Sequence, residues 1–218
     1  MIKIENLCKT FWDINIFKNL NLELKPWDFI SIIWPSWSGK STLLNLISGI
    51  DKDFSWDIKI NNTSLNSLSK DETTNFRGKN ISYIFQNFRL IDNLTVKENI
   101  DLIIEINNLK RVFFTKEILK LVWLEHKENT YAYNLSWWES QRVAIARAFV
   151  WETKLLLADE PTWSLDIKNK KNIMDLIVSL HKKTKNTIIT ITHDQDIANM
   201  ADEIYELKNY SLIKYKNV

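Results

Sequence analysis

The sequence predicts an α/β fold with a mostly parallel sheet, an antiparallel β-rich N-terminal part and a helical subdomain. Three observations predict it. A short apolar run at 29–33 leads through a loop into a helical pattern at 40–49. A second apolar run at 154–158 is followed by a helix and then by a third apolar run at 187–192. A helix-rich stretch lies between these units, and strand–helix–strand order of this kind favours parallel strands.

The elements before residue 95 alternate between strand and helix signals. Residues 2–33 read as strands, and the helix from Lys40 is closed by Gly49, a common residue at the end of a helix. Two further strands flank a polar stretch that contains a short helix. The strands are expected at 2–5, 16–24, 29–33, 58–60 and 81–85, and the short helix at 71–77.

From residue 95 to about residue 150 the apolar residues recur at helical spacing. The strand pattern returns at 154–158 and 187–192, with a helix at 167–183 between them. We therefore expect a single domain, 1–218, whose core covers about 1–90 and 150–218. The helical subdomain then covers about 91–149.

The composition is that of an ordinary folded chain of 218 residues, 45% hydrophobic and 26% charged. The net charge of +2 gives no field that favours nucleic acid as a partner. The single cysteine, Cys8, excludes an internal disulfide and fits a reducing compartment. No apolar run reaches the roughly 18–20 residues of a membrane span, and the first residues do not resemble a signal peptide. We expect a cytoplasmic protein that contacts a membrane only through another protein.

The strongest local motif follows the strand at 29–33. The pattern G-x-x-x-x-G-K-[ST] marks a phosphate-binding loop, and Gly39-Lys40-Ser41 satisfies its second half. Loop amides and the helix N-terminus would bind the β- and γ-phosphates, Lys40 would add a positive charge, and the Ser41 hydroxyl would coordinate Mg²⁺. The alternative is a chance turn before a helix. The candidate nucleotide-binding residues here are Trp34, Pro35, Ser36, Trp37, Ser38, Gly39, Lys40, Ser41 and Thr42.

A second motif is the apolar run 155–158 followed by Asp159 and Glu160. In a metal-assisted nucleotide hydrolase the first carboxylate holds Mg²⁺, and the second acts as general base on the attacking water. Taken alone, two acidic residues before a proline are more often a turn. Together with a phosphate-binding loop upstream, they predict the core of a P-loop NTPase.

A third motif, Leu135-Ser136-Trp137-Trp138-Glu139, opens the strongest helical pattern in the chain. Ser136 and Glu139 have the spacing of a capping box, in which each side chain bonds the other residue's backbone N–H. Capping boxes are common, so this motif on its own indicates only the start of a helix.

The order of these motifs resembles the ATP-binding subunit of an ABC transporter over essentially the whole chain. The resemblance rests on the phosphate-binding loop, the 135–139 signature, L-L-L-A-D-E-P-T at 155–162, Ser164-Leu165-Asp166 and Thr192-His193-Asp194. It implies that Phe11 stacks on adenine, that Gln86 is a catalytic residue that also contacts Mg²⁺, and that His193 contacts the γ-phosphate. Structural alternatives stay open for Phe11 as a packed hydrophobe and for His193 as a residue without a catalytic role. Residues 49–52, 76–77 and 84–91 are similar to the lipoprotein-releasing and macrolide-export branch.

The resemblance also implies partners and a mechanism. Two copies would enclose two ATP molecules head to tail, with Ser136, Trp137, Trp138 and Glu139 of one copy near the γ-phosphate of the other and Asp166 at the same interface. The dimer would drive a separate membrane permease, in the direction of export, through a surface on the helical subdomain beside Gln86. A non-transport membrane complex, as in cell division, is an alternative. A chromosome-maintenance ATPase is excluded, because the stretch between Lys40 and Ser136 is too short for a long coiled coil.

Glycine and tryptophan usage is abnormal. An average usage of about 7% predicts about 15 glycines, whereas the chain has three glycines and ten tryptophans. Several tryptophans stand where the family has glycine, and none stands where a buried indole is expected. We hypothesise that these residues are encoded by UGA codons that the source organism translates as glycine. The alternative is an inactive cassette with true tryptophans. The ten positions are Trp12, Trp27, Trp34, Trp37, Trp56, Trp123, Trp137, Trp138, Trp151 and Trp163.

Overall fold

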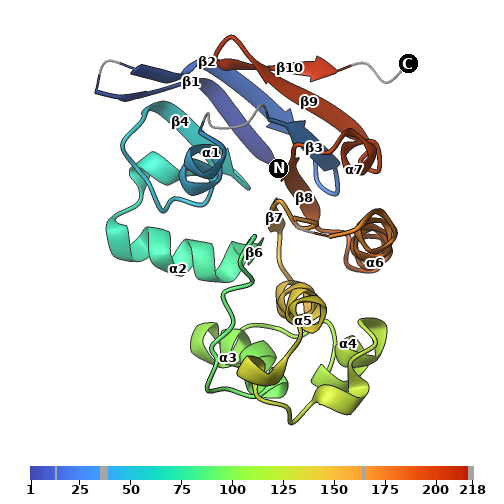
Figure 1. The fold of residues 1–218 in the computed structure, drawn as a ribbon. Coiled ribbons are helices and arrows are strands. Elements are labelled where there is room, and N and C mark those ends of the chain that lie inside the picture. Colours follow the sequence, from blue (N-terminus) through green and yellow to red (C-terminus); the bar gives the residue numbers. More distant parts are fainter. Residues whose placement is uncertain (13, 35–38, 164, 216–218) are drawn as a thin grey trace.

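The computed structural model describes residues 1–12, 14–34, 39–163 and 165–215. Figure 1 shows two sheets in the upper part of the molecule and a group of helices in the lower part. The strands are β1 (Ile2–Phe11), β2 (Ile14–Leu24), β3 (Phe29–Ile33), β4 (Ser55–Ile60), β5 (Thr63–Ser64), β6 (Ile81–Ile84), β7 (Leu155–Asp159), β8 (Thr187–Thr192), β9 (Glu203–Lys208) and β10 (Ser211–Tyr215). The α-helices are α1 (Lys40–Ile47), α2 (Lys70–Asn80), α3 (Val96–Asn107), α4 (Thr115–Leu121), α5 (Trp137–Phe149), α6 (Ile167–Thr184) and α7 (Gln195–Ala198).

The larger sheet has the order β10-β9-β3-β8-β7-β6. Its pairs β9–β3, β3–β8, β8–β7 and β7–β6 are parallel, and β10–β9 is antiparallel. The smaller sheet, β2-β1-β4-β5, is antiparallel throughout. The predicted α/β fold with a mostly parallel sheet and an antiparallel N-terminal part is therefore confirmed.

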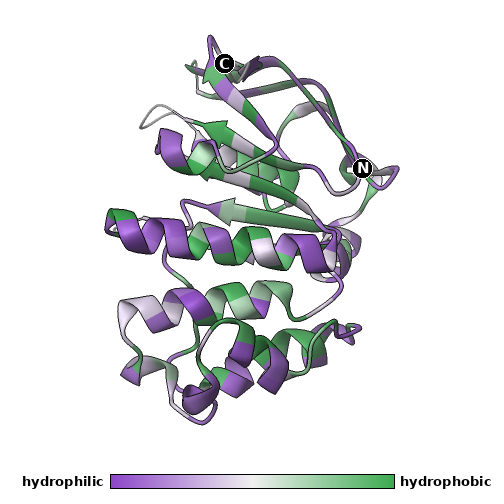
Figure 2. Cartoon of the chain, turned by 90° about the vertical axis from the view of Figure 1, so that its right-hand side faces the viewer, coloured by the Kyte–Doolittle hydropathy of each residue, from purple (hydrophilic) through white to green (hydrophobic). Residues whose placement is uncertain are grey.

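Local signals explain where the helices begin and end. Capping boxes start α2 at Ser69, α3 at Thr95 and α5 at Ser136. Helix α1 ends just before Gly49, whose φ of +68° suits a residue without a side chain. Figure 2 shows α6 with alternating polar and apolar colour along its length, as expected for a helix that buries one face, here through Ile173, Met174, Leu176, Ile177 and Leu180.

The helices α3, α4 and α5 lie together at the lower end of the molecule in Figure 1. Buried residues of these helices form one apolar cluster with residues of α6 and β7. A second cluster joins β1, β2, β4 and one face of the parallel sheet to α1. The parallel sheet is thus packed on both faces, as parallel sheets require.

The strands β9 and β10 were not predicted from the sequence. They form a hairpin at the edge of the larger sheet, and Asn209 and Tyr210 in its turn have φ values of +50° and +67°. Two left-handed turn residues are typical of a tight hairpin, but the usual signal is a glycine. A tyrosine at the second position gives no such signal, so the hairpin was missed.

The expectation that no tryptophan is buried was wrong for two of them. Trp34 and Trp151 are 1% and 2% exposed. The indole of Trp34 packs edge-on against Phe17, with ring centroids 5.9 Å apart. The Nε1 atom of Trp151 finds no hydrogen-bond partner among the residues that the structure describes, although buried tryptophan N–H groups usually have one.

Three other tryptophans have the backbone conformation that favours glycine. The φ angles of Trp12, Trp27 and Trp123 are +53°, +73° and +59°. Their side chains are 98%, 60% and 55% exposed, so little packing compensates for the strain. A bulky aromatic residue in the left-handed region is a steric outlier, and glycine is not. These three positions therefore support glycine on backbone grounds.

Replacing a tryptophan by glycine should have opposite effects at the two kinds of position. In the tryptophan-bearing chain, Trp12→Gly relieves a left-handed backbone and should raise the free energy of unfolding by about 1 kcal/mol. The matched control, Trp151→Gly, deletes a buried indole and should lower it by roughly 3 kcal/mol. Urea unfolding followed by circular dichroism measures both, and a loss of stability in Trp12→Gly would contradict the assignment of strain.

Candidate functional site

The candidate site lies where three parallel strands end at one edge of the larger sheet. Residue 33 of β3 pairs with Thr192 of β8, and Asp159 of β7 pairs with Ile191. Since the strands run in the same direction, the residues that follow them emerge side by side. The backbone N–H of Glu160 continues this contact by donating to the carbonyl of Ile191 at 3.0 Å.

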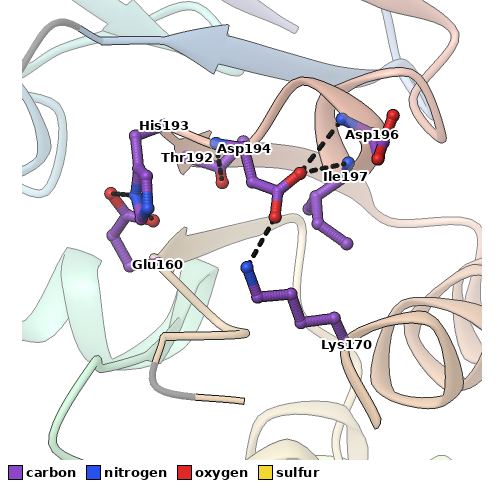
Figure 3. A network of polar contacts seen from close by, with 7 residues as sticks. All are labelled: Glu160, Lys170, Thr192, His193, Asp194, Asp196 and Ile197. Carbon is purple, nitrogen blue, oxygen red and sulfur yellow. Dashed lines mark hydrogen bonds and ion pairs between the residues drawn. The ribbon is translucent and has the colours of Figure 1, made fainter. Parts of the chain in front are cut away.

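Lys40, Glu160 and His193 meet at this edge. The Lys40 Nζ atom lies 2.6 Å from Glu160 Oε1. The Nδ1 atom of His193 lies 2.9 and 3.0 Å from the two oxygens of the same carboxylate, as the left part of Figure 3 shows. Glu160 is 2% exposed, so its carboxylate is shielded from solvent and contacts these two partners. Its backbone is left-handed, with a φ of +46°. One carboxylate thus connects residues from three separate motifs.

Asp159 lies beside this cluster at the end of β7 and is half-buried. Burial raises the pKa of its carboxyl above the usual range, and the negative charge of Glu160 raises it further, while Lys40 partly offsets both. Two neighbouring carboxylates at one sheet edge are therefore electrostatically unfavourable without a cation.

The phosphate-binding loop is described only at its two ends, because Pro35, Ser36, Trp37 and Ser38 lie outside the described residues. Gly39 has a φ of +85°, and a Cβ atom there would come within 2.5 Å of the Ile16 side chain. Glycine is therefore required at this position by both backbone and space. Ser41 is exposed and Thr42 is half-buried at the start of α1.

Trp34, at the start of the phosphate-binding loop, is not among the described residues with a positive φ. Its indole belongs to the apolar cluster that includes α1 and packs edge-on against Phe17 of β2. A Cβ atom on Gly39 would lie 3.8 Å from this ring, so the indole stays close to Gly39.

The signature motif forms the capping box expected from its spacing. The backbone N–H of Ser136 donates to Glu139 Oε2 at 2.8 Å, and Lys127 Nζ lies 2.9 Å from Glu139 Oε1. Burial alone would raise the pKa of Glu139, but the hydrogen bonds from Lys127 and Ser136 outweigh it and lower the pKa to about 2. Trp137 is 43% exposed and contacts Phe88. The indole of Trp138 packs partly against the helical cluster instead of standing free at the surface.

The remaining predicted residues lie at or next to the ends of strands and helices. Gln86 is half-buried and follows β6, the strand beside β7. Phe11 is 44% exposed at the end of β1. Asp166 accepts a hydrogen bond from the backbone N–H of Asn169 at 3.0 Å and caps α6. Ser164 lies outside the described residues.

Sequence analysis missed several side chains around His193. Figure 3 shows the Asp194 carboxylate accepting hydrogen bonds from the backbone N–H groups of Asp196 and Ile197. The Lys170 Nζ atom lies 2.6 Å from Oδ2 of the same carboxylate. The ring of Trp163 lies edge-on to the His193 ring, with centroids 5.4 Å apart. These contacts fix the loop that carries His193. No motif in the sequence marks Lys170, since its role depends on how α6 packs beside α7.

Comparison with known proteins gives concordant matches. The family model described as ABC transporter matches residues 17–163. The chain is 38% identical to the ABC transporter ATP-binding protein MJ0796 of Methanocaldococcus jannaschii, over 96% of this chain and 94% of that protein. It is 39% identical to the lipoprotein-releasing system ATP-binding protein LolD of Buchnera aphidicola, over 97% of this chain and 96% of that protein.

A third relative is longer. The chain is 38% identical to the macrolide export ATP-binding/permease protein MacB of Campylobacter fetus over 98% of its own length, but spans only 34% of that protein. Among solved structures, the dimeric post-hydrolysis state of MJ0796 bound to ADP and Pi superposes with a TM-score of 0.86 at 36% identity, covering 99% of this chain and 98% of that one.

Fold, motifs and comparisons define an ATP-binding cassette with a P-loop α/β core. The chain belongs to the ABC transporter family, in the branch that includes LolD and MacB, and is an ATPase.

The ion pair of Glu139 predicts a pH-dependent contribution to stability. Because its pKa of about 2 lies below the value of about 4.3 in an unfolded chain, the contribution is complete above pH 4.3 and is lost as the pH falls through 2. Glu139→Gln should lower the free energy of unfolding by roughly 2 kcal/mol at pH 7 and by progressively less below pH 4. Urea unfolding at a series of pH values measures this.

The matched control is Glu117→Gln, which changes a first-turn glutamate whose carboxylate accepts a hydrogen bond from the backbone N–H of Phe114 at 2.7 Å. We expect Glu117→Gln to lower the free energy of unfolding by less than Glu139→Gln does. A loss in Glu139→Gln that stays constant from pH 7 to pH 2 would refute the ion-pair account.

Proposed function

We propose that this chain is the ATP-hydrolysing subunit of a membrane transporter, and that Lys40, Glu160 and His193 form the centre of its active site. The contact among these three side chains at the carboxyl edge of the parallel sheet is the observation that carries the proposal. Lys40 comes from the phosphate-binding motif, Glu160 follows the apolar strand β7, and His193 follows the neighbouring strand β8. Ligands of α/β proteins bind at this edge.

The triphosphate would lie against Gly39, Lys40 and the N-terminus of α1. The helix N-terminus offers free backbone N–H groups to an anion, and Lys40 adds a full positive charge. The Lys40 ammonium is paired with Glu160 in the structure. Binding of the γ-phosphate would take over Lys40, because a phosphate group carries more charge than a carboxylate. Glu160 is then free to accept a proton from the attacking water. His193 stays within reach of Glu160 and of the γ-phosphate.

Mg²⁺ fits the residues present. Asp159, Ser41 and Gln86 offer the oxygen ligands that this ion prefers, and Mg²⁺ commonly binds to one or two carboxylates together with substrate phosphates. Burial raises the pKa of the Asp159 carboxyl, and a cation bound beside it would favour its charged form. When bound, Mg²⁺ would neutralise charge that develops on the phosphates.

A second copy of the chain is the proposed partner across the nucleotide. The solved relative MJ0796 is dimeric with ADP and Pi bound. Ser136 lies at the N-terminus of α5, where free N–H groups attract an anion. Ser136, Trp137, Trp138 and Glu139 would meet the γ-phosphate held by the other copy. Asp166 is exposed at the start of α6 and would lie in the same interface.

A permease is the proposed membrane partner, with export as the direction. The described residues contain no helix long and apolar enough to cross a membrane. The names of MacB and LolD place those relatives in macrolide export and lipoprotein release. We place the chain on the cytoplasmic face of the membrane, held there by the permease. A non-transport membrane complex remains the second candidate.

A groove of about 250 Å³ between β6 and α3 suits this contact. It is lined by aromatic, aliphatic and arginine side chains, among them Tyr83, Phe85, Arg89, Ile103 and Ile106. Apolar and arginine side chains of this kind are enriched in protein interfaces. The lining residue Phe85 immediately precedes Gln86, so an occupant of the groove would lie next to the nucleotide site.

The proposal requires glycine at the loop positions written as tryptophan. Support comes from the left-handed backbone at Trp12, Trp27 and Trp123 and from the presence of the polar residues Lys40, Glu160 and His193. A decaying cassette would lose charged groups as readily as glycines. We therefore favour UGA codons translated as glycine over an inactive protein.

Changing Glu160 should separate binding from hydrolysis. With both variants made under the decoding of the source organism, Glu160→Gln should lower kcat for Mg²⁺-ATP by about 10²–10⁴-fold, because the buried base is lost, while ATP binding persists. The matched control Glu152→Gln alters an exposed glutamate that pairs with Lys154 and should keep the parent rate. Phosphate release and equilibrium nucleotide binding measure the two effects, and undiminished turnover in Glu160→Gln would exclude Glu160 as the base.

A charge in the groove should break the membrane contact. Ile106 is 71% exposed at the groove, so Ile106→Glu should abolish copurification with a multi-span membrane protein without changing basal ATP hydrolysis. The control Ile213→Glu, on β10, should leave copurification intact. A copurified protein with a large extracytoplasmic domain would favour export, and retention of the partner by Ile106→Glu would reject the groove as the contact.

A further inference from the structure

Lys9 is a buried lysine for which the proposed mechanism has no role. It lies on β1, and its side chain is only 2% exposed. The Nζ atom lies 2.9 Å from Asp51 Oδ2 and 3.1 Å from Asp53 Oδ2, and it also donates to the Asp53 carbonyl oxygen. Burying an ammonium group is costly unless carboxylates and hydrogen bonds compensate it, so the position is well specified.

The same ammonium group lies over the ring of Phe11. The distance from Lys9 Nζ to the ring centroid is 4.8 Å, within the range of a cation–π contact. Lys9 and Phe11 are two positions apart on β1, and their side chains meet although the strand pairing shifts register between Lys9 and Thr10. Phe11 is nevertheless 44% exposed. The ring is thus held by Lys9 and remains accessible to a ligand.

The two aspartates connect this ring to the phosphate-binding helix. Asp51 lies four residues after the end of α1, and its backbone N–H donates to the carbonyl of Asn45 in that helix at 3.1 Å. The backbone N–H of Asp53 donates to Asp51 Oδ1 at 2.8 Å. Helix α1 begins at Lys40. Lys9 therefore ties the end of the β1–β2 hairpin to the helix whose other end faces the triphosphate.

We propose that Lys9 is a positioning residue for the nucleotide base. It holds the Phe11 ring at a fixed place relative to α1, so that the ring can stack on the purine of a nucleoside triphosphate whose phosphates lie at Lys40. The inference rests on the proposed function, together with the base contact that the family resemblance implies for Phe11. A purely structural lysine would stabilise the hairpin without affecting how the base is bound.

The test compares a ligand with a base and a ligand without one. With all variants made under the decoding of the source organism, Lys9→Met should raise the KM for ATP about fivefold with little change in kcat. The inhibition constant of inorganic tripolyphosphate, which has no base to stack, should stay at the parent value. Lys9→Arg keeps a cation and should restore most of the affinity for ATP.

Phe11→Ala distinguishes this inference from the proposed function. If Phe11→Ala leaves the KM for ATP unchanged, the base contact itself is wrong. If Phe11→Ala raises it and Lys9→Met does not, only the positioning role of Lys9 is wrong. The double variant should be no weaker than Phe11→Ala alone, because Lys9 acts through the ring.

Asp51→Asn weakens the same anchor from the side of α1 and serves if Lys9→Met does not fold. It should raise the KM for ATP and not the inhibition constant of tripolyphosphate. If either variant weakens the binding of ATP and of tripolyphosphate equally, the whole site has loosened, and the proposal is overturned.

Discussion

The contact of Lys40 and His193 with one buried carboxylate, that of Glu160, is the interaction on which the account depends. It exists because β3, β7 and β8 are parallel neighbours whose carboxyl ends meet at one edge. The Glu160 carboxylate is buried and contacts both side chains, so the fold itself brings these three groups together.

Backbone freedom is the second constraint. Amide groups can surround a phosphate only where no side chain occupies the space, and Gly39 meets this condition with a φ of +85° and Ile16 close by. The exposed left-handed tryptophans repeat the same requirement at turns. Trp34 shows that a single indole can be accommodated when a neighbouring strand offers an aromatic partner. Glycine at Trp12, Trp27 and Trp123 would remove the strain at these turns.

The sequence predicted the parallel core because its buried strands are short, apolar and rich in isoleucine and leucine, and because each is followed by a chemical motif. The meeting of Lys40, Glu160 and His193 followed from the common direction of those strands. The β9–β10 hairpin was missed because Tyr210 hides its turn. The burial of Trp34 and the contact of Lys9 with Phe11 were also missed, since both depend on side chains from other elements that no local pattern reveals.

Intact-mass spectrometry of the protein purified from its own cells, with ATP turnover recorded on the same sample, tests the central claim most directly. The account predicts a mass lower than that of the printed sequence by ten indolylmethyl side chains, each replaced by hydrogen, together with Mg²⁺-dependent hydrolysis. A mass that corresponds to ten tryptophans combined with rapid hydrolysis would contradict it. Such a result would mean that the phosphate-binding backbone tolerates bulky rings where the account requires none.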